Sequence, residues 1–260
     1  MQDLKVTLIQ AKQEWEDKES NLTHFNTLLN EIDQPTDLII LPEMFQTAFT
    51  MNAAAMAEPM DGPSLIWLKQ KAREKETAII ASLIISEERN YYNRMVFVTP
   101  DLNVQHYDKR KLFSLAKEDE HYTAGEQNKI IKYKSWKILL QVCYDLRFPE
   151  IARNKVVDGI FDYDAIVYVA NWPEKRSLHW KVLLQARAIE NQCYVIGVNR
   201  VGKDANDLIY SGDSCLISPT GELEQYHAFD EIIMNDMLEV DVLQEVRSKL
   251  AFLKDRKVVT

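Results

Sequence analysis

The sequence has few cysteines and few glycines, and neither set forms a familiar binding motif. Its three cysteines include no C-x-x-C pair, so neither a disulfide framework nor a zinc knuckle fits. The seven glycines form neither a phosphate-cradling loop nor a dinucleotide fingerprint. The five histidines show no H-E-x-x-H or comparable metal spacing. These absences indicate no metal site and leave at least one cysteine open to a reactive role.

The chain also lacks an excess of positive charge and a long apolar run. Its formal net charge is −9, and no basic stripe is present that would neutralise nucleic-acid phosphates. The most apolar segment, residues 78–85, is far too short to span a bilayer. The amino-terminal segment lacks the apolar stretch of a secretory signal. We therefore expect a cytoplasmic protein that binds neither nucleic acid nor membrane. The negative net charge does not exclude an anionic small-molecule substrate, because a few Arg and Lys side chains are enough to make one pocket locally positive.

The composition predicts one domain. Hydrophobic residues make up 46% of the chain, and no linker, repeat or composition shift marks a boundary. We expect a single domain over residues 1–260, with an amphipathic tail from about residue 243.

Strand-like and helix-like segments alternate along the chain, and hairpin turns join several strands. Apolar runs predict strands at residues 4–9, 37–41, 77–85, 91–99, 104–107, 129–133, 136–142, 165–170, 193–199, 209–217 and 231–242. Helical spacing predicts helices at residues 21–32, from residue 61 and at 175–192, the last with Leu178, Val182, Ala186 and Ile189 on one face. A purely parallel doubly wound sheet would lack the hairpins. The pattern predicts an α/β fold in which two mixed sheets pack face to face with helices outside.

Three residues that could carry chemistry follow predicted strands or lie in the adjoining loops. Cys143 directly follows the strand at 136–142, where a thiol suits a nucleophile, although a small buried hydrophobe is an equal alternative. Glu43 follows the strand at 37–41 beside apolar side chains, and partial desolvation there suits a general base. Lys109, in a basic segment, could neutralise an oxyanion. Taken alone, a solvated surface position is the better interpretation of Glu43 and of Lys109.

A papain-like cysteine–histidine pair is the main rival within cysteine chemistry. It would need His179 or a more distant histidine, and the local cysteine signature of that family is absent. His179 falls in the middle of a predicted helix beside Trp180, which favours a packing role.

Together the candidate segments resemble the nitrilase, or carbon–nitrogen hydrolase, superfamily. Its glutamate, lysine and cysteine motifs match, in the family's order, residues 41–43 (LPE), 107–113 (YDKRKLF) and 142–150 (VCYDLRFPE). One such motif is weak, but three in order are specific. The likeness covers nearly the whole chain and is closest to the bacterial ω-amidases. Segments similar to that subgroup are residues 170–173 (ANWP), 176–180 (RSLHW), 186–192 (ARAIENQ) and 210–214 (YSGDS).

The resemblance implies a fold, an assembly and catalytic roles. It implies a four-layer α-β-β-α sandwich that forms a homodimer and needs no metal or organic cofactor. Glu43 would take the proton of Cys143, whose thiolate attacks an amide carbonyl. Lys109 and the backbone N–H of Tyr144 would stabilise the oxyanion, and Lys109 would also lower the thiol pKa. A second, supporting glutamate of the family falls on Glu120.

The resemblance also suggests how a small amide substrate would be bound. Arg147 is the best candidate to hold a substrate carboxylate and Arg176 is the second, although Asp145 or Glu150 would equally serve as partner of Arg147. Asp145 is also expected to order the turn after Cys143.

Aromatic side chains are candidates for the pocket wall. They are Phe45, Phe113 and Trp172, with a place in the core as the alternative. The leading hypothesis is hydrolysis of the ω-amide of dicarboxylic 2-oxo acid monoamides such as 2-oxoglutaramate. An N-carbamoyl-amino-acid or aliphatic amide hydrolase, a metal-dependent phosphoesterase and a catalytically silent binding protein are the alternatives, and the intact catalytic set argues against the last.

Overall fold

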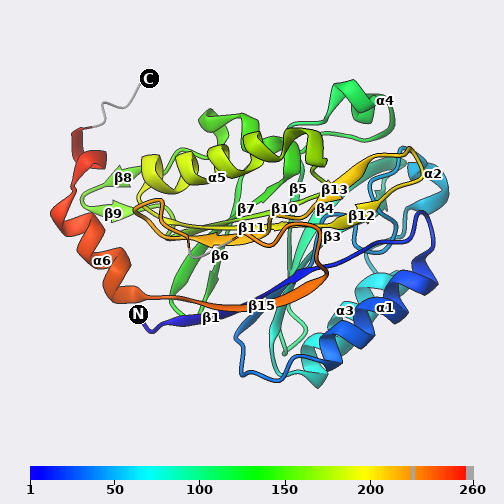
Figure 1. The fold of residues 1–260 in the computed structure, drawn as a ribbon, viewed down its shortest axis with the longest axis horizontal. Helices are drawn as coiled ribbons and strands as arrows, with labels where there is room; N and C mark the ends of the chain where they lie inside the picture. The colour runs from blue at the N-terminus through cyan, green and yellow to red at the C-terminus, as the bar shows by residue number, and fades with distance from the viewer. Residues whose placement is uncertain (224–225, 256–260) are drawn as a thin grey trace.

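Two mixed β-sheets lie face to face with helices on their outer sides in the computed structural model, which describes residues 1–223 and 226–255 (Figure 1). The larger sheet has the strand order β15-β1-β2-β3-β4-β5, and the smaller has the order β14-β11-β10-β7-β6. The larger sheet contains β1 (Leu4–Gln10), β2 (Leu38–Ile40), β3 (Ala78–Glu87), β4 (Asn90–Val98), β5 (Val104–Asp108) and β15 (Ile232–Leu238). The smaller sheet contains β6 (Lys129–Tyr133), β7 (Trp136–Val142), β10 (Ala165–Ala170), β11 (Tyr194–Asn199) and β14 (Cys215–Ile217).

Helices and short strand pairs complete the described chain. The α-helices are α1 (Lys18–Asn30), α2 (Ala53–Met56), α3 (Pro63–Glu74), α4 (Glu118–His121), α5 (Ser177–Asn191) and α6 (Val240–Lys249). Single 3₁₀ turns are η1 (Ser114–Ala116), η2 (Cys143–Arg147), η3 (Pro149–Ile151), η4 (Glu174–Arg176) and η5 (Phe252–Asp255). The two antiparallel pairs are β8 (Val156–Val157) with β9 (Ile160–Phe161), and β12 (Val201–Lys203) with β13 (Ile209–Ser211).

The central core lies between the two sheets, because neighbouring residues of a strand point to opposite faces. In β2, Ile40 packs in the cluster between the sheets, whereas Ile39 packs in the cluster under the helices. In β7, Leu140 faces the other sheet and Leu139 faces away from it. Both faces of these strands are therefore buried, which explains why they are continuous apolar runs in the sequence.

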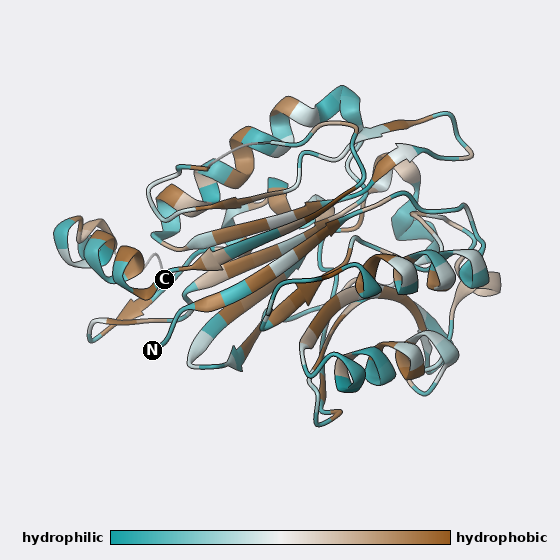
Figure 2. Ribbon diagram, turned by 60° about the horizontal axis from the view of Figure 1, so that its bottom comes forward, coloured by the Kyte–Doolittle hydropathy of each residue, from teal (hydrophilic) through white to brown (hydrophobic). Residues whose placement is uncertain are grey.

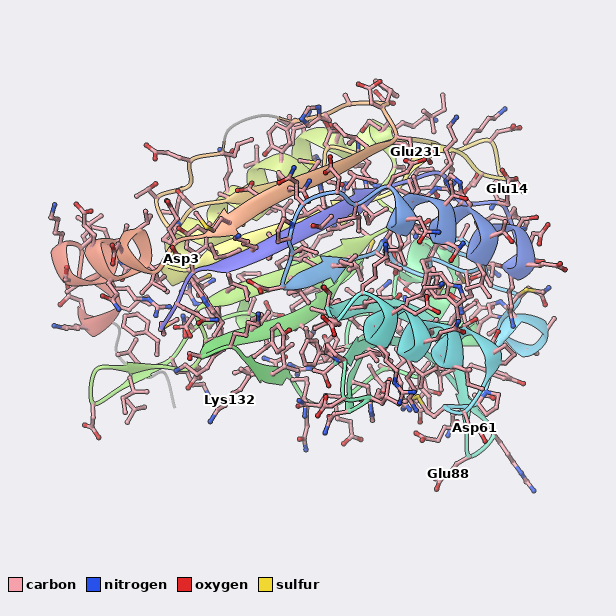
Figure 3. All side chains as sticks on the ribbon, turned by 90° about the horizontal axis from the view of Figure 1, so that it is seen from below. Asp3, Glu14, Asp61, Glu88, Lys132 and Glu231 are labelled. Carbon is pink, nitrogen blue, oxygen red and sulfur yellow. The ribbon has the colours of Figure 1, made fainter. Side chains whose placement is uncertain are left out.

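Helices cover each outer sheet face. Helices α1 and α3 place Phe25, Leu29 and Leu68 against the larger sheet, and α5 places Trp180 and Leu184 against the smaller one. Figure 2 shows the apolar colour concentrated along the strands between these helical layers. Seen from the α1 and α3 side, the labelled charged residues lie around the outside (Figure 3): Asp3, Glu14, Asp61, Glu88, Lys132 and Glu231. The predicted α-β-β-α sandwich is confirmed. None of the helices in the described part of the chain is long and apolar enough to cross a membrane.

The strand predicted at residues 209–217 is wrong as a single element. It is two strands: β13 pairs with β12, and β14 extends the smaller sheet. Gly212 and Asp213 break the run with φ values of +77° and +59°. A Cβ on Gly212 would lie 2.3 Å from the side chain of Gln10, so the close approach of Gln10 also requires glycine here.

The predicted helix at 175–192 is confirmed as η4 and α5, but the face with Leu178, Val182 and Ile189 does not enter the core. These three side chains are 71%, 52% and 52% exposed, and the opposite face with Trp180 and Leu184 is buried. The tail expected from about residue 243 is helix α6, which starts at Val240, and residues 256–260 lie outside the described residues.

Candidate active site

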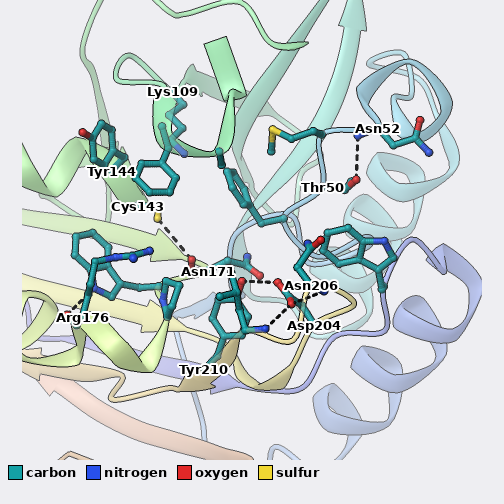
Figure 4. A pocket seen from close by; sticks show the side chains of 18 of the residues that line it. Thr50, Asn52, Lys109, Cys143, Tyr144, Asn171, Arg176, Asp204, Asn206 and Tyr210 are labelled. Carbon is teal, nitrogen blue, oxygen red and sulfur yellow. Dashed lines mark hydrogen bonds between the residues drawn. The ribbon is translucent and has the colours of Figure 1, made fainter. Parts of the chain in front are cut away.

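A cavity of about 500 Å³ opens at the carboxyl ends of strands from both sheets. Cys143 follows β7, Asn171 follows β10 and Lys109 follows β5. Figure 4 shows the side chains around it, with Tyr144 and Arg176 on one side of Cys143 and Asp204, Asn206 and Tyr210 on the other. Since β7 and β10 are parallel, their carboxyl ends meet at one sheet edge and deliver their loops to the same place.

Cys143 occupies a strained position at the start of η2. Its φ of +44° is unusual for a residue with a side chain, and such strain is common at functional sites. The sulfur lines the cavity and lies 4.0 Å from the carbonyl oxygen of Asn171. Cys193 and Cys215, by contrast, are buried in the core beside α5. The geometry therefore singles out Cys143 as the accessible thiol.

Asp145 holds the turn that presents the thiol. Its carboxylate accepts hydrogen bonds from the N–H of Val142 at 2.9 Å, the N–H of Lys111 at 2.9 Å and the hydroxyl of Tyr107 at 2.8 Å. The turn after β7 is thereby tied to β5 and to the loop that carries Lys109. Burial nevertheless raises the pKa of Asp145 to about 6.

Glu43 is a buried carboxylate with a hydrogen-bond donor on each oxygen. Its Oε1 accepts from the side-chain amide of Asn93 at 2.7 Å and from Nζ of Lys109 at 3.1 Å. Its Oε2 accepts from the backbone N–H of Asn171 at 2.7 Å. The alternative of a solvated strand-end glutamate is therefore wrong, because Glu43 has no exposed surface.

Lys109 joins Glu43 to a second carboxylate. Its ammonium is fully buried and lies 2.9 Å from both oxygens of Glu118. Burial lowers the pKa of Lys109, but the attraction of Glu118 and Glu43 outweighs burial and leaves the pKa above its ordinary value. The lysine is therefore a fixed cation beside the thiol, and the alternative of a solvated basic turn is wrong.

The assignment of the supporting glutamate to Glu120 is wrong, and Glu118 takes that place. Glu120 is exposed on α4 and lies 3.6 Å from Nζ of Lys117. Glu118, two residues earlier, points the other way from this single helical turn and also accepts from the N–H of Phe113 at 2.6 Å. Burial raises the pKa of Glu118.

The resting thiol of Cys143 holds its proton. Burial and the neighbouring charge of Glu43 raise the pKa of Cys143 well above its ordinary value, and Lys109 opposes them only in part. The expectation that Lys109 lowers the thiol pKa is confirmed for its own effect, but burial and Glu43 outweigh that effect. A thiol in this state needs a base at the moment of attack, and Glu43 is the adjacent carboxylate.

Two arginines line the side of the cavity nearest Tyr144. Arg147 stacks its guanidinium 4.6 Å from the Trp172 ring and lies 3.3 Å from Nδ1 of His179. Arg176 lies over the ring of Phe113 at 5.5 Å. Burial and the nearby charge of Arg176 lower the pKa of Arg147. His179 is exposed on α5, so the packing role expected for it is wrong.

Neither carboxylate considered as a partner for Arg147 binds it. Asp145 is directed at backbone N–H groups and Tyr107, and Glu150 lies 3.6 Å from Lys111. Within residues 1–223 and 226–255, no carboxylate forms an ion pair with Arg147 or Arg176. This end of the cavity therefore carries uncompensated positive charge.

Of the three aromatic residues considered for the wall, two line the cavity. They are Phe113 and Trp172. Phe45 does not, because it packs under α1 and α3, with its ring 5.3 Å from Phe25 and 5.6 Å from Trp67. Phe49 lines the cavity instead and lies 5.0 Å from Nζ of Lys109.

Several site residues were not singled out from the sequence. Asn93, Glu118 and Phe49 lie in segments without a chemical motif, although a polar Asn93 within an apolar strand is a usable signal. Other residues of the lining were also not anticipated, and they include Trp15, Glu16, Asn52, Asp204 and Tyr210. Among the described residues, no group of three or more His, Cys, Asp or Glu side chains is arranged to hold a metal ion.

Comparison with known proteins agrees with this geometry. The sequence matches the carbon–nitrogen hydrolase family over residues 5–237. It is 42% identical to the omega-amidase YafV of Yersinia enterocolitica over 98% of this chain and 97% of that protein. It is 29% identical to the 2-oxoglutaramate amidase of Bacillus subtilis over 90% of each. The structure of XC1258 from Xanthomonas campestris, a CN-hydrolase superfamily protein with an arsenic adduct in the active site, is similar with a TM-score of 0.97 and 38% identity, covering 100% of this chain and 99% of that one. The chain therefore belongs to the carbon–nitrogen hydrolase, or nitrilase, superfamily and is an amidohydrolase.

Proposed function

We propose that the chain hydrolyses the ω-amide of small dicarboxylic 2-oxo acid monoamides of the 2-oxoglutaramate type, giving the dicarboxylate and ammonia. The observation that carries this proposal is the pair Arg147 and Arg176, which line the same cavity as Cys143 without a carboxylate partner in the described chain. A partly buried cation is costly unless an anion meets it. A substrate with an amide at one end and a carboxylate at the other places the amide at the thiol and the carboxylate at the arginines. The names of the relatives support the same substrate class.

The first half of the proposed reaction forms a thioester. Glu43 takes the proton of Cys143, and the sulfur forms a bond to the amide carbon. The former carbonyl oxygen becomes an oxyanion, for which the ammonium of Lys109 and the backbone N–H of Tyr144 are the donors. One such donor is typically worth about 3 kcal/mol in the transition state. Glu43 then gives its proton to the amide nitrogen, the carbon–nitrogen bond breaks, and ammonia leaves.

The second half uses the same groups on water. Glu43 takes a proton from a water molecule, and the water oxygen attacks the thioester carbon. The oxyanion forms again at the same donors, and the carbon–sulfur bond breaks as the proton returns to the sulfur. Two moderate barriers thereby replace one high barrier.

Substitution of Arg147 by lysine tests the substrate class. The guanidinium can hold a carboxylate through two parallel hydrogen bonds, whereas an ammonium cannot. We expect Arg147→Lys to lower kcat/KM for 2-oxoglutaramate about ten- to a hundredfold, as the loss of a hydrogen bond to a charged group predicts. Butyramide, which has no carboxylate, is expected to be a poor substrate for both proteins and to be little affected. The same comparison with Arg176→Lys tests the second arginine, and equal losses for both substrates would count against carboxylate anchoring.

Two alternatives within the superfamily keep the same catalytic centre. An N-carbamoyl-amino-acid hydrolase also acts on an anionic substrate, and an aliphatic amidase acts on a neutral one. Ammonia release from a panel of small amides separates them from the proposed activity. The metal-dependent phosphoesterase is wrong, because the chain belongs to a family that acts on carbon–nitrogen bonds.

We also propose that the chain is a cytoplasmic homodimer. The absence of disulfides among its three cysteines fits a reducing compartment. Helix α5 carries Leu178, Val182 and Ile189 on one exposed face, and such an apolar row on a surface helix suits contact with a second copy.

A further inference from the structure

We infer that Asn93 is a positioning residue for catalysis, which holds the carboxylate of Glu43 in place and fixes which of its oxygens acts as the base. The inference rests on the proposed role of Glu43 as the proton acceptor. Asn93 lies in β4 and has no exposed surface. It is not among the residues that line the cavity, so it acts through Glu43 rather than on the substrate.

The side-chain amide of Asn93 bridges the two buried carboxylates. Its Nδ2 donates to Oε1 of Glu43 at 2.7 Å and to Oε1 of Glu118 at 3.3 Å. Lys109 donates to the same two oxygens, at 3.1 Å and 2.9 Å. Asn93 is therefore the neutral group that, together with Lys109, donates to both carboxylates.

The orientation of this amide is set by a hydrogen-bond chain through β3. The backbone N–H of Met44 donates to Oγ of Ser82 at 2.8 Å, so the Ser82 hydroxyl is left to donate in turn. It donates to Oδ1 of Asn93 at 3.1 Å. A flipped amide would turn its carbonyl oxygen toward two carboxylates and lose all of these contacts. The NH₂ group must therefore face Glu43.

Charge explains why a neutral donor is needed. Glu43 and Glu118 carry two negative charges when ionised, and Lys109 supplies one positive charge in the same fully buried space. Among the described residues, Glu43 also raises the pKa values of Cys143 and Tyr122, and neither of these groups is a cation. Hydrogen bonds to an ionised carboxylate favour that form, so the Asn93 amide offsets part of the uncompensated charge.

The two oxygens of Glu43 are left unequal by this arrangement. Oε1 accepts two protein hydrogen bonds, from Asn93 and Lys109, whereas Oε2 accepts one from the backbone N–H of Asn171 at 2.7 Å. The oxygen with fewer donors keeps a lone pair for an incoming proton. Oε2 is thereby the oxygen that takes the proton of the Cys143 thiol and later that of water.

Asn93→Leu tests the inference, because leucine has a similar volume and no donor. Without the amide, the negative charge of Glu43 has one hydrogen-bond donor fewer in a fully buried space, so the acid limb of the rate profile should move upward. We expect kcat to fall about a hundredfold at pH 7 with KM changed less than threefold, and the loss to shrink as the pH is raised. Glu43→Gln has no carboxylate to act as the base, so it gives the residual rate, which should not recover as the pH is raised.

A second readout needs no substrate. The rate of Cys143 alkylation by iodoacetamide, followed against pH, should show the same upward displacement in Asn93→Leu. This readout still tests Asn93 if none of the proposed amides is hydrolysed, so failure of the inference and failure of the proposed function are distinguishable. Asn90→Leu, at the exposed start of the same strand, is the matched control and should behave as wild type.

Ser82→Ala provides a milder variant should Asn93→Leu fail to fold. It removes the donor that fixes the Asn93 amide and should shift both profiles in the same direction by a smaller amount. Unchanged pH profiles in the folded variants, or an equal loss of rate at every pH, would overturn the inference.

Discussion

At the scale of single residues, the site combines a proposed nucleophile that holds its proton with a proposed base whose oxygens accept three hydrogen bonds. Burial and Glu43 raise the pKa of the Cys143 thiol, so free thiolate is scarce at neutral pH. Glu43 compensates because Lys109, Asn93 and Asn171 all donate to it. Proton transfer between two adjacent buried groups moves charge without first exposing it to water, which suits a reaction that starts and ends with a neutral thiol.

Replacement of the three cysteines separates the nucleophile from the core thiols. Cys143→Ala is expected to abolish amide hydrolysis with little change in the circular dichroism spectrum or Tm, because the side chain lies at the cavity. Cys193→Ala and Cys215→Ala remove buried sulfurs, so they should stay active and lose about 1 to 2 kcal/mol of stability. Ammonia release and thermal melts measure both effects. Full activity of Cys143→Ala would disprove the mechanism.

The sequence predicted the three central groups but not all of their partners. Glu43, Lys109 and Cys143 each follow a strand and sit in a motif, so strand ends and motif order together located them. Glu118 was missed because its loop has no hydrophobic periodicity. Glu120, which was chosen instead, lies two residues later on the same short helical turn and faces solvent. Phe45 was predicted to line the cavity, but Phe49 lines it instead. Local sequence did not reveal this either, since the chain after β2 turns at Met44 with a φ of +45°.

At the scale of elements, the turn after β7 fixes the relative positions of Cys143 and Lys109. Asp145 receives donors from β7, from β5 and from the loop after Lys109, so one carboxylate sets the distance between nucleophile and cation. No periodicity in the sequence predicts such a tie, because its partners are backbone groups brought together only by the fold. The sequence did predict that Asp145 orders this turn.

Asp145 gives the turn a pH dependence whose sign can be derived. Burial raises its pKa to about 6 from an ordinary 3.8. The folded protein thus binds this proton more tightly than the unfolded chain does. The stability from this group is fully present below about pH 4 and is lost as the pH rises through about 6, by at most about 3 kcal/mol.

Urea unfolding of wild type and Asp145→Asn at several pH values measures this contribution. We expect the wild-type free energy of unfolding, relative to the variant, to fall by about 1 to 3 kcal/mol between pH 4 and pH 7. The neutral amide of the variant does not titrate and so serves as the reference. A difference that stays constant with pH, or that grows toward pH 7, would contradict the raised pKa.

Element prediction was most accurate where burial is simple. Strands β2, β3, β7 and β10 are apolar on both faces, so their runs are continuous and their bounds are close to those predicted. The run at 209–217 looks just as continuous, but Gly212 and Asp213 break it. The break depends on the approach of Gln10, about 200 residues earlier, which no local pattern can reveal.

At the scale of the whole molecule, the layered fold brings distant segments to one edge. Glu43 comes from the larger sheet and Cys143 from the smaller, and the contact between Glu43 and Asn171 links the two. The site therefore exists only when both sheets are packed, so the central core is a requirement of catalysis as well as of stability. Alternating strands and helices in the sequence predicted these layers, because each layer buries the face that the pattern marks as apolar.

The apolar row on α5 is an exception to the rule that the face marked as apolar by the sequence pattern is buried in the core. The pattern of Leu178, Val182 and Ile189 has the spacing of a core-facing stripe, yet these residues point outward and the smaller sheet contacts Trp180 and Leu184. A helix that is apolar on two faces indicates two partners. One partner is the sheet, and the proposed second partner is another copy of the chain.

Val182→Asp tests this surface. A carboxylate placed in a dry contact without a partner costs about 3 kcal/mol or more, which weakens dimerisation at least a hundredfold. We expect sedimentation to show a dimer for wild type and a monomer for Val182→Asp at micromolar concentration. Ile66→Asp, a matched change at a side chain that is 56% exposed on α3, should remain dimeric. A monomeric wild type would refute the homodimer. A Val182→Asp protein that stays dimeric would place the interface away from α5.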